Sequence, residues 1–206
     1  MHLDKESAFD ELTRRIQQRV STLPKGLQAH IYRARDIAIE LARKHDIDSQ
    51  CAALGALAHD ICRAMPSQEL INHAARLNLP IGLVERHAPV LLHGPVGAEI
   101  LRQEEGLSDQ SLYQAVYWHT TAHPSLDPVG KVVFLADKLD HQKIKRYPYQ
   151  PYLRELALVN LDSAILEFLT RELIALTSQG QMVHPMVVEA RNALLASSVS
   201  AKAPVQ

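Results

Sequence analysis

The chain has 206 residues, of which 47% are hydrophobic and 22% charged, and its formal net charge is −1. This length is enough to bury a substantial core and predicts a single domain over residues 1–206. The near-neutral charge gives no reason to expect nucleic-acid or membrane-surface binding, and no apolar run reaches the roughly 18 residues of a membrane span. Because residues 1–20 are charged and amphipathic, unlike a signal peptide, we expect a cytoplasmic protein.

Alanine and leucine are abundant, whereas aromatic residues make up only 5% of the chain, and this balance favours helices. Apolar residues recur at helical spacing, without an alternating strand pattern, an internal repeat or a glycine-rich phosphate loop. The predicted fold class is therefore all-α, with a core over about 27–195 and a frayed tail at 197–206. In chain order, we expect helices at 4–20, 27–44, 49–63 and 67–78, one from Pro80 toward His87, one starting near Pro95, one capped by Ser108, an apolar segment at 131–140, a long helix at 153–176 and a last one after Pro185.

The most informative stretch is AALGALAHDI, residues 52–61. Up to Ala58 it contains only alanine, leucine and one glycine, so a helix there is apolar on every face and buried. It ends in His59-Asp60. Burying an unpaired carboxylate costs on the order of several kcal/mol, so this pair must be hydrogen-bonded, ion-paired or bound to a metal. Imidazole and carboxylate together suit a divalent cation.

The chain contains a second His-Asp pair that serves as a comparison. His45-Asp46 follows two charged residues at a polar helix end, where an imidazole suits the helix dipole, and we expect it to be solvated. The two cysteines, Cys51 and Cys62, form no C-x-x-C motif and are expected to be reduced thiols in or near the apolar helix.

Further polar residues lie in or beside apolar helical segments, each about one helix and one connection from the next. In order they are His30, His59-Asp60, His93, His119 and Asp137. A helical bundle can bring these segments to one interior site. We therefore expect them to form a metal centre.

A lone histidine, an adjacent His-Asp pair and a distant aspartate resemble the HD-domain metal-dependent phosphohydrolases. Within that superfamily, four segments resemble the YqeK family of symmetrical bis(5'-nucleosyl)-tetraphosphatases: LLHGPVGA, the His-Thr of VYWHT, LADK and HPMVVEARNALL. The resemblance spans about residues 27–195. It implies a single HD-domain helical bundle that hydrolyses diadenosine tetraphosphate symmetrically to two ADP, by means of a metal-activated water.

The same resemblance implies roles for individual residues. It places the metal on His30, His59, Asp60 and Asp137, with iron as the expected ion and manganese or cobalt as alternatives. It predicts catalytic roles for Asp60, His93, His119 and Lys138. It predicts substrate contacts from Arg63, His93, His119, Lys138, Lys143 and Asn192. One ion is favoured over two, because binuclear relatives tend to carry a further histidine where this chain has Thr120.

Two segments depart from the family pattern. Ile61-Cys62-Arg63 stands where an aliphatic run and a lysine are usual, and Lys143 stands where an arginine with its bidentate fork is usual. Alternative functions are therefore hydrolysis of nucleotides or other phosphate esters, and nucleotide sensing without catalysis. The expected partner is a nucleotide or dinucleoside polyphosphate, not nucleic acid or a membrane, and a homodimer is left open.

Several residues have simpler structural explanations. Lys138 could extend its side chain to solvent. Exposed positions in a proline-rich loop are expected for Tyr147, Tyr149 and Tyr152, in preference to stacking on a base. Surface or structural roles are expected for the remaining histidines: His2, His73, His87, His123, His141 and His184.

Overall fold

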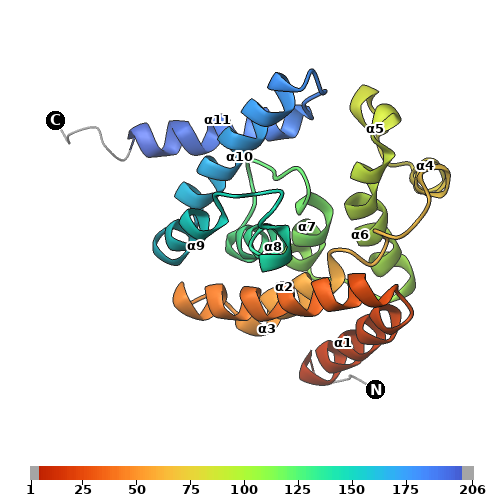
Figure 1. The fold of residues 1–206 in the computed structure, drawn as a ribbon. Helices are drawn as coiled ribbons and strands as arrows, with labels where there is room; N and C mark the ends of the chain where they lie inside the picture. The colour runs from red at the N-terminus through yellow and green to blue at the C-terminus, as the bar shows by residue number, and fades with distance from the viewer. Residues whose placement is uncertain (1–4, 201–206) are drawn as a thin grey trace.

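The computed structural model of the chain describes residues 5–200, and within them it contains only helices and their connections (Figure 1). The predicted all-α class is confirmed. No helix in this range combines the length and apolar character needed to cross a membrane. The elements are α1 (Lys5–Ser21), α2 (Lys25–Lys44), α3 (Ser49–Ala58), α4 (Ser67–Arg76), α5 (Leu83–His87), η1 (Pro89–Leu92), α6 (His93–Glu104), α7 (Gln110–Trp118), α8 (Pro128–Lys138), η2 (His141–Lys143), α9 (Gln150–Val159), α10 (Leu161–Ser178) and α11 (Pro185–Ser200).

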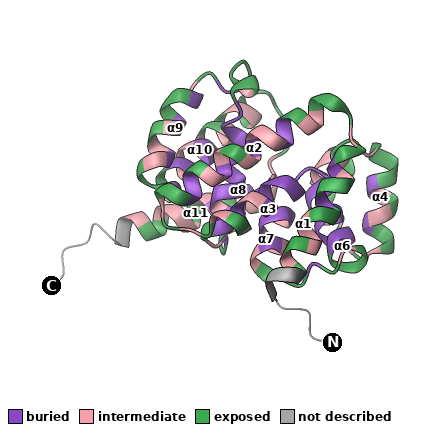
Figure 2. Ribbon diagram, turned by 90° about the horizontal axis from the view of Figure 1, so that it is seen from below, coloured by how far each residue is buried: buried purple, intermediate pink, exposed green. Residues whose placement is uncertain are grey.

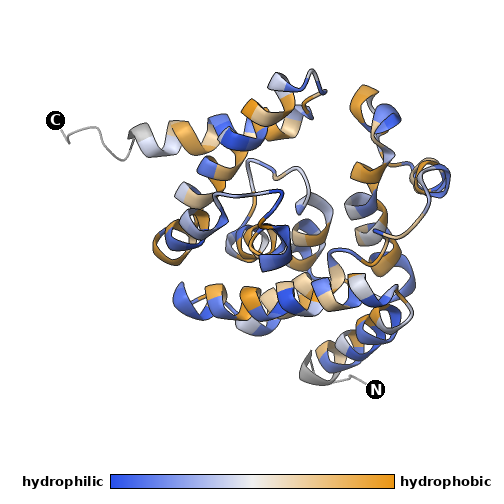
Figure 3. Ribbon diagram, viewed as in Figure 1, coloured by the Kyte–Doolittle hydropathy of each residue, from blue (hydrophilic) through white to orange (hydrophobic). Residues whose placement is uncertain are grey.

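Helix α3 lies between two hydrophobic cores. Ala52 and Ala56 pack in the core shared with α8 to α11, whereas Leu54 and Leu57 pack in the core shared with α1, α4 and α6. The burial colours show α3 and α8 as largely buried ribbon (Figure 2). In contrast, hydrophobic and hydrophilic residues alternate along α1 and α2, as amphipathic helices require (Figure 3). The apolar stretch noted in the sequence is thus the central helix of the fold.

The two cores give the molecule two groups of helices on either side of α3 and α8. Helices α4, α5 and α6 lie on one side, and α9, α10 and α11 lie on the other (Figure 1). Helix α2 runs along both groups and contributes residues to both cores. The candidate site lies where these groups meet.

Helix α3 is shorter than predicted, because it ends at Ala58 instead of continuing to residue 63. The Nδ1–H of His59 donates to the carbonyl of Ala56, the acceptor that the backbone N–H of Asp60 would use in a continuing helix. Turns follow, in which a backbone N–H donates to the carbonyl of the third preceding residue, as Arg63 does to Asp60 at 2.9 Å. His59 and Asp60 therefore lie at a helix end.

The prediction of one long helix at 153–176 is wrong in one respect. This segment forms two helices, α9 and α10, which meet at Asn160. This residue is extended, and its side chain caps α10 by accepting from the backbone N–H of Ser163 at 2.8 Å. The asparagine side chain satisfies a backbone N–H at the start of α10. It does so from an extended backbone conformation, which interrupts a continuous helix.

Smaller differences concern the ends of other helices. Asp109, not Ser108, caps α7, by accepting from the backbone N–H of Leu112. Pro66, not Ser67, precedes α4, and α5 begins at Leu83, not near Pro80. Helix α11 continues to Ser200, into the segment predicted as a tail. The remaining tail, 201–206, and residue 4 of the predicted first helix lie outside the described residues.

Candidate metal centre

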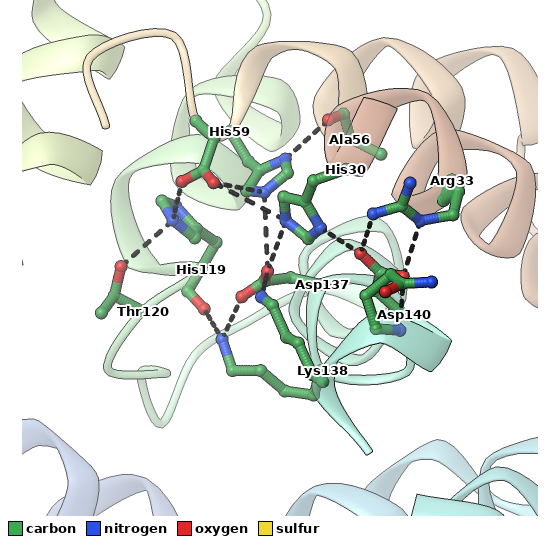
Figure 4. A network of polar contacts seen from close by, with 12 residues as sticks. His30, Arg33, Ala56, His59, His119, Thr120, Asp137, Lys138 and Asp140 are labelled. Atoms are coloured by element: carbon green, nitrogen blue, oxygen red, sulfur yellow. Dashed lines mark hydrogen bonds and ion pairs between the residues drawn. The ribbon is translucent and has the colours of Figure 1, made fainter. Parts of the chain in front are cut away.

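Four buried side chains from three parts of the fold converge on one point. They are His30 from α2, His59 and Asp60 from the turn after α3, and Asp137 from α8, and their ligating atoms all lie within 4.8 Å of one another (Figure 4). His30 Nε2 lies 3.0 Å from Asp137 Oδ1, and His59 Nε2 lies 3.4 Å from Asp60 Oδ2. The structure thus brings together the four residues that the sequence predicts as metal ligands.

The Nε2 atom of His59 tests whether these residues fit a metal. It is fully buried and makes no hydrogen bond within the described part of the chain. A buried polar atom without a partner costs roughly 1–3 kcal/mol. It points at the two carboxylates, and a divalent cation at the common point would accept its lone pair. Two imidazoles and two carboxylates are a donor set that such a cation accepts, so the residues fit the predicted group.

Hydrogen bonds at Nδ1 orient three of the histidines alike. His59 donates to Ala56 O at 2.6 Å, and His119 donates to Val116 O at 2.7 Å. His93 makes the same contact with the carbonyl of the third preceding residue. Each of these histidines stands next to a helix end, where such carbonyls are accessible. Their Nε2 atoms therefore all face the interior of the site.

His93 and His119 form a second group around Asp60. Oδ1 of this aspartate lies 2.9 Å from His93 Nε2 and 3.5 Å from His119 Nε2, while its Oδ2 faces His59. The two Nε2 atoms lie 2.8 Å apart. These three residues form a further arrangement that is able to hold a metal ion. Asp60 therefore connects the four predicted ligands to both predicted phosphate-facing histidines.

Two lysines neutralise Asp137. Lys138 is buried and donates to Asp137 Oδ2 at 2.7 Å and to the carbonyl of His119 at 2.8 Å, so its side chain does not extend to solvent. Lys143 forms an ion pair with Oδ1 of the same carboxylate. Burial lowers the pKa of Lys138, although Asp137 opposes this effect. Both lysines are thus held at the edge of the four-residue cluster.

Burial and charge act in opposite directions on the ligands. Burial disfavours the imidazolium of His59, but Asp60 and Asp137 outweigh it and raise its pKa to about 10. Burial lowers the pKa of His119 to about 3. Burial also disfavours ionised Asp60 and Asp137, yet the surrounding imidazoles and lysines hold both pKa values well below the usual range. The two carboxylates are therefore ionised at neutral pH.

A cavity of about 850 Å³ opens onto this cluster. Four cationic side chains line it together with the predicted ligands: Arg63, Lys138, Lys143 and Arg146. Many of its other lining residues are apolar, among them Val84, Leu91, Phe168, Leu176, Met182 and Val187. The cavity thus combines cationic with apolar side chains.

Some residues lie elsewhere than the sequence predicts. Asn192 is exposed and is not among the residues that line the cavity. It follows the lining residue Val187 by five positions on α11, about 500° of rotation, so it faces another direction. Tyr147 is buried against Phe168 and lines the cavity, whereas Tyr152 is exposed as expected.

Two histidine assignments gain detail. His184 lines the cavity, and its Nε2 lies 2.8 Å from Oε1 of Glu85, so that it connects the segment before α11 to α5. His45, which follows α2, is half-buried and not solvated as predicted, because it contacts the carbonyl of Ala157 in α9, whereas Asp46 is exposed. His45 takes no part in the cluster.

Sequence reasoning missed a group of buried or half-buried polar residues behind His30. Asp140 is 1% exposed and contacts His30 Nδ1, and the guanidinium of Arg33 binds the same carboxylate. Buried Gln150 donates to the carbonyls of Lys138 and Asp140. The available signal was the second acidic residue in LADKLD and an arginine one turn after His30.

The chain is similar in sequence to known proteins. The HD domain family matches residues 27–142. A Bacillus subtilis protein named symmetrical bis(5'-nucleosyl)-tetraphosphatase is 30% identical over 169 residues, which cover 82% of this chain and 89% of that protein. A protein of the same name from Halalkalibacterium halodurans is 30% identical over 81% of this chain and 87% of its own length.

A solved structure has a similar fold. It is the crystal structure of a protein from Clostridium acetobutylicum described as an HD superfamily hydrolase involved in NAD metabolism. It covers 96% of this chain and all of that chain, with a TM-score of 0.81 and 22% sequence identity. At this identity the likeness concerns the fold alone.

Proposed function

This chain belongs to the HD domain family, as the sequence resemblance predicted, and we propose that it is a cytoplasmic metal-dependent hydrolase of dinucleoside polyphosphates. The proposed reaction cleaves diadenosine tetraphosphate symmetrically into two ADP, the activity named in its relatives. The observation that carries the proposal is the convergence of His30, His59, Asp60 and Asp137 on one point at the cavity. Among the residues that the structure describes, His59 Nε2 has no hydrogen-bond partner.

The four converging residues are the proposed ligands of one divalent cation, with iron expected first and manganese or cobalt as alternatives. Such a cation polarises a phosphoryl oxygen and lowers the pKa of water from 15.7 to about 7. One ion is favoured over two because Thr120 follows His119, where binuclear relatives tend to carry a histidine. The threonine hydroxyl lies 3.1 Å from His119 Nε2 and is a poorer ligand for such an ion.

His93 and His119 are proposed to act on the phosphates. Because both Nδ1–H groups face backbone carbonyls, the 2.8 Å contact between the two Nε2 atoms requires one proton between them. Asp60 Oδ1 lies beside this proton. We propose that the pair donates it in a hydrogen bond to a phosphate oxygen, or transfers it to the departing phosphate.

The cationic side chains that line the cavity are proposed to hold the polyphosphate. Lys138 and Lys143 stand at Asp137, and Arg63 lies at the exposed rim. The apolar lining residues are proposed to receive a nucleoside, for which Tyr147 and Phe168 offer aromatic surface. A ligand with both charged and apolar groups matches this lining.

The direct test is hydrolysis of diadenosine tetraphosphate by purified protein loaded with iron, manganese or cobalt. We expect ADP as the sole nucleotide product and no activity in Asp60→Asn, whose fold is checked by circular dichroism. Release of AMP with ATP would exclude the symmetrical reaction. Absence of any nucleotide product with all three metals would exclude this substrate.

A second candidate function keeps the metal centre but changes the substrate to nucleotides or other phosphate esters. The lysine at position 143 and the arginine at position 63 favour it, because both alter the cationic groups of the family pattern. A panel of nucleoside monophosphates, diphosphates and dinucleoside polyphosphates separates the two. Tight nucleotide binding without turnover of any panel member would instead support the non-catalytic sensor.

A further inference from the structure

Asp140 lies between His30 and Arg33 and contacts both. Its Oδ2 lies 2.6 Å from His30 Nδ1. Arg33 donates from Nε to Oδ1 at 2.7 Å and from Nη2 to Oδ2 at 2.9 Å, a two-point contact that fixes the plane of the carboxylate (Figure 4). His30 and Arg33 are three residues apart on α2 and so share one face of the helix.

His30 needs this partner because of its place in the fold. The other three histidines stand next to helix ends and use the carbonyl of the third preceding residue for Nδ1. His30 is the sixth residue of a 20-residue helix, where the preceding carbonyls accept the helix's own backbone bonds. Only a group from another element is available to hold its Nδ1–H, and Asp140 is that group.

We propose that Asp140 and Arg33 are positioning residues that hold the ring of His30 with Nε2 directed at the metal centre. The inference rests on the proposed function, since it takes His30 as a ligand. A carboxylate at Nδ1 fixes the tautomer and orientation of a ligating histidine and raises its basicity. Arg33 acts through Asp140, because its guanidinium holds the carboxylate in the orientation that His30 requires.

Gln150 supports this arrangement from a third direction. Its buried amide donates to the backbone carbonyls of Lys138 and Asp140, each at 2.8 Å. It therefore ties the start of α9 to the last residue of α8 and to Asp140. This contact helps to hold Asp140 in place behind His30.

The test is cobalt(II) binding by the full chain, measured by calorimetry and by the visible absorption spectrum of the bound ion, without any substrate. Asp140→Asn keeps the size of the side chain but removes its charge, and we expect about 10–100-fold weaker binding and a changed spectrum. Arg33→Gln is expected to weaken binding less. Because Arg33 acts through Asp140, the double variant should bind no more weakly than Asp140→Asn alone.

Asp127→Asn is the matched control. Asp127 caps α8 through its carboxylate and stands at the other end of this helix, about 15 Å of helix away from Asp137. Asparagine keeps the capping acceptor, so this variant should change little in thermal stability and should keep the wild-type cobalt affinity and spectrum. Thermal melts of all variants separate loss of binding from loss of fold.

Wild-type affinity and an unchanged spectrum in folded Asp140→Asn would overturn the inference. If the wild type itself bound no cobalt, the proposed metal centre and this inference would fall together. Weakened binding in the variants, combined with no turnover of diadenosine tetraphosphate by the wild type, would support the inference and remove only the substrate assignment.

Discussion

His93 Nε2 lies 2.8 Å from His119 Nε2, and both atoms lie within 3.5 Å of Oδ1 of Asp60. Two imidazole nitrogens so close to each other and to a carboxylate oxygen require either a shared proton or a second cation between them. We expect one metal ion per chain in the wild type and in His93→Ala, and a kcat for His93→Ala lowered by about 10²–10⁴, because a proton donor is lost and not a ligand. Elemental analysis and steady-state kinetics on the same samples measure both.

Two further variants serve as controls for the metal content and the activity. His59→Ala should lose the ion, whereas His73→Ala, on α4 and outside both the cavity lining and the metal cluster, should keep both the ion and the activity. Two ions in the wild type and one in His93→Ala would show that the histidine pair binds a second metal.

Substitutions at Lys143 are expected to change the affinity for the substrate. It lines the cavity and pairs with Asp137, but it donates from a single point. We expect Lys143→Arg to lower KM for diadenosine tetraphosphate several-fold, and Lys143→Ala to raise it about tenfold, with kcat less affected. Initial-rate kinetics measure this.

The neighbouring Lys145 provides the control for that substitution. It is exposed and is not among the cavity-lining residues, so Lys145→Arg should leave both constants unchanged. An unaltered KM in both Lys143 variants would mean that this lysine makes no contact with the polyphosphate.

The central part of the site could be predicted because its signal is local. An all-apolar segment ending in His-Asp requires a buried polar pair, and the structure contains it at α3. Asp137 and His30 are more than 100 positions apart, so their contact depends on the packing of α2 against α8. Their place in apolar helical segments made them candidates, and the resemblance to a known family assigned them as ligands.

Other features escaped prediction because tertiary contacts decide them. Asp140 resembles an ordinary solvated residue in the sequence, and only its contacts with His30 and Arg33 place it inside. Tyr147 lies in a proline-rich connection that is typically exposed, yet Phe168 of α10 covers it. The apolar periodicity continues across Asn160, so nothing in the pattern marks the break between α9 and α10.

The cap at Asn160 predicts a defined loss of stability. Its side chain accepts from the backbone N–H of Ser163 at 2.8 Å. Asn160→Ala should lower the free energy of unfolding by about 1 kcal/mol, whereas Asn160→Asp, which keeps the acceptor, should change it little. Urea denaturation measures the difference. Equal stability of the alanine variant and the wild type would mean that the cap does not stabilise α10.

The thiol of Cys51 should react slowly at neutral pH. Burial, and secondarily the charge of Asp48, raise its pKa from 9.0 to about 11. Because the thiolate is the nucleophile, alkylation at pH 8 should be about 100-fold slower than for an ordinary thiol and should rise tenfold per pH unit up to about pH 11. Peptide mass spectrometry after timed exposure to iodoacetamide measures this rate. A plateau already near pH 9 would contradict the raised pKa.

Gly94 lies where α6 closely approaches α7, and a substitution there is expected to displace His93 relative to His119. A Cβ atom there would lie 2.8 Å from the carbonyl oxygen of Tyr117 and 3.0 Å from that of Val116, which accepts the Nδ1–H of His119. Backbone cannot yield as a flexible side chain does, so Gly94→Ala must push α6 away from α7 and separate His93 from His119. We expect a loss of about 1–3 kcal/mol in stability. We also expect kcat to fall by up to about 10²-fold, the cost of an ångström of misplacement.

Gly97→Ala, one turn further along α6, is the matched substitution. Its nearest neighbour would be Ile61 Cγ1 at 3.4 Å, an ordinary contact, so it should keep the wild-type kcat and gain stability from the better helix former. Urea denaturation and kinetics on the two variants give the comparison. If Gly94→Ala matched Gly97→Ala in both measurements, the approach of α6 to α7 would not be what places His93 beside His119.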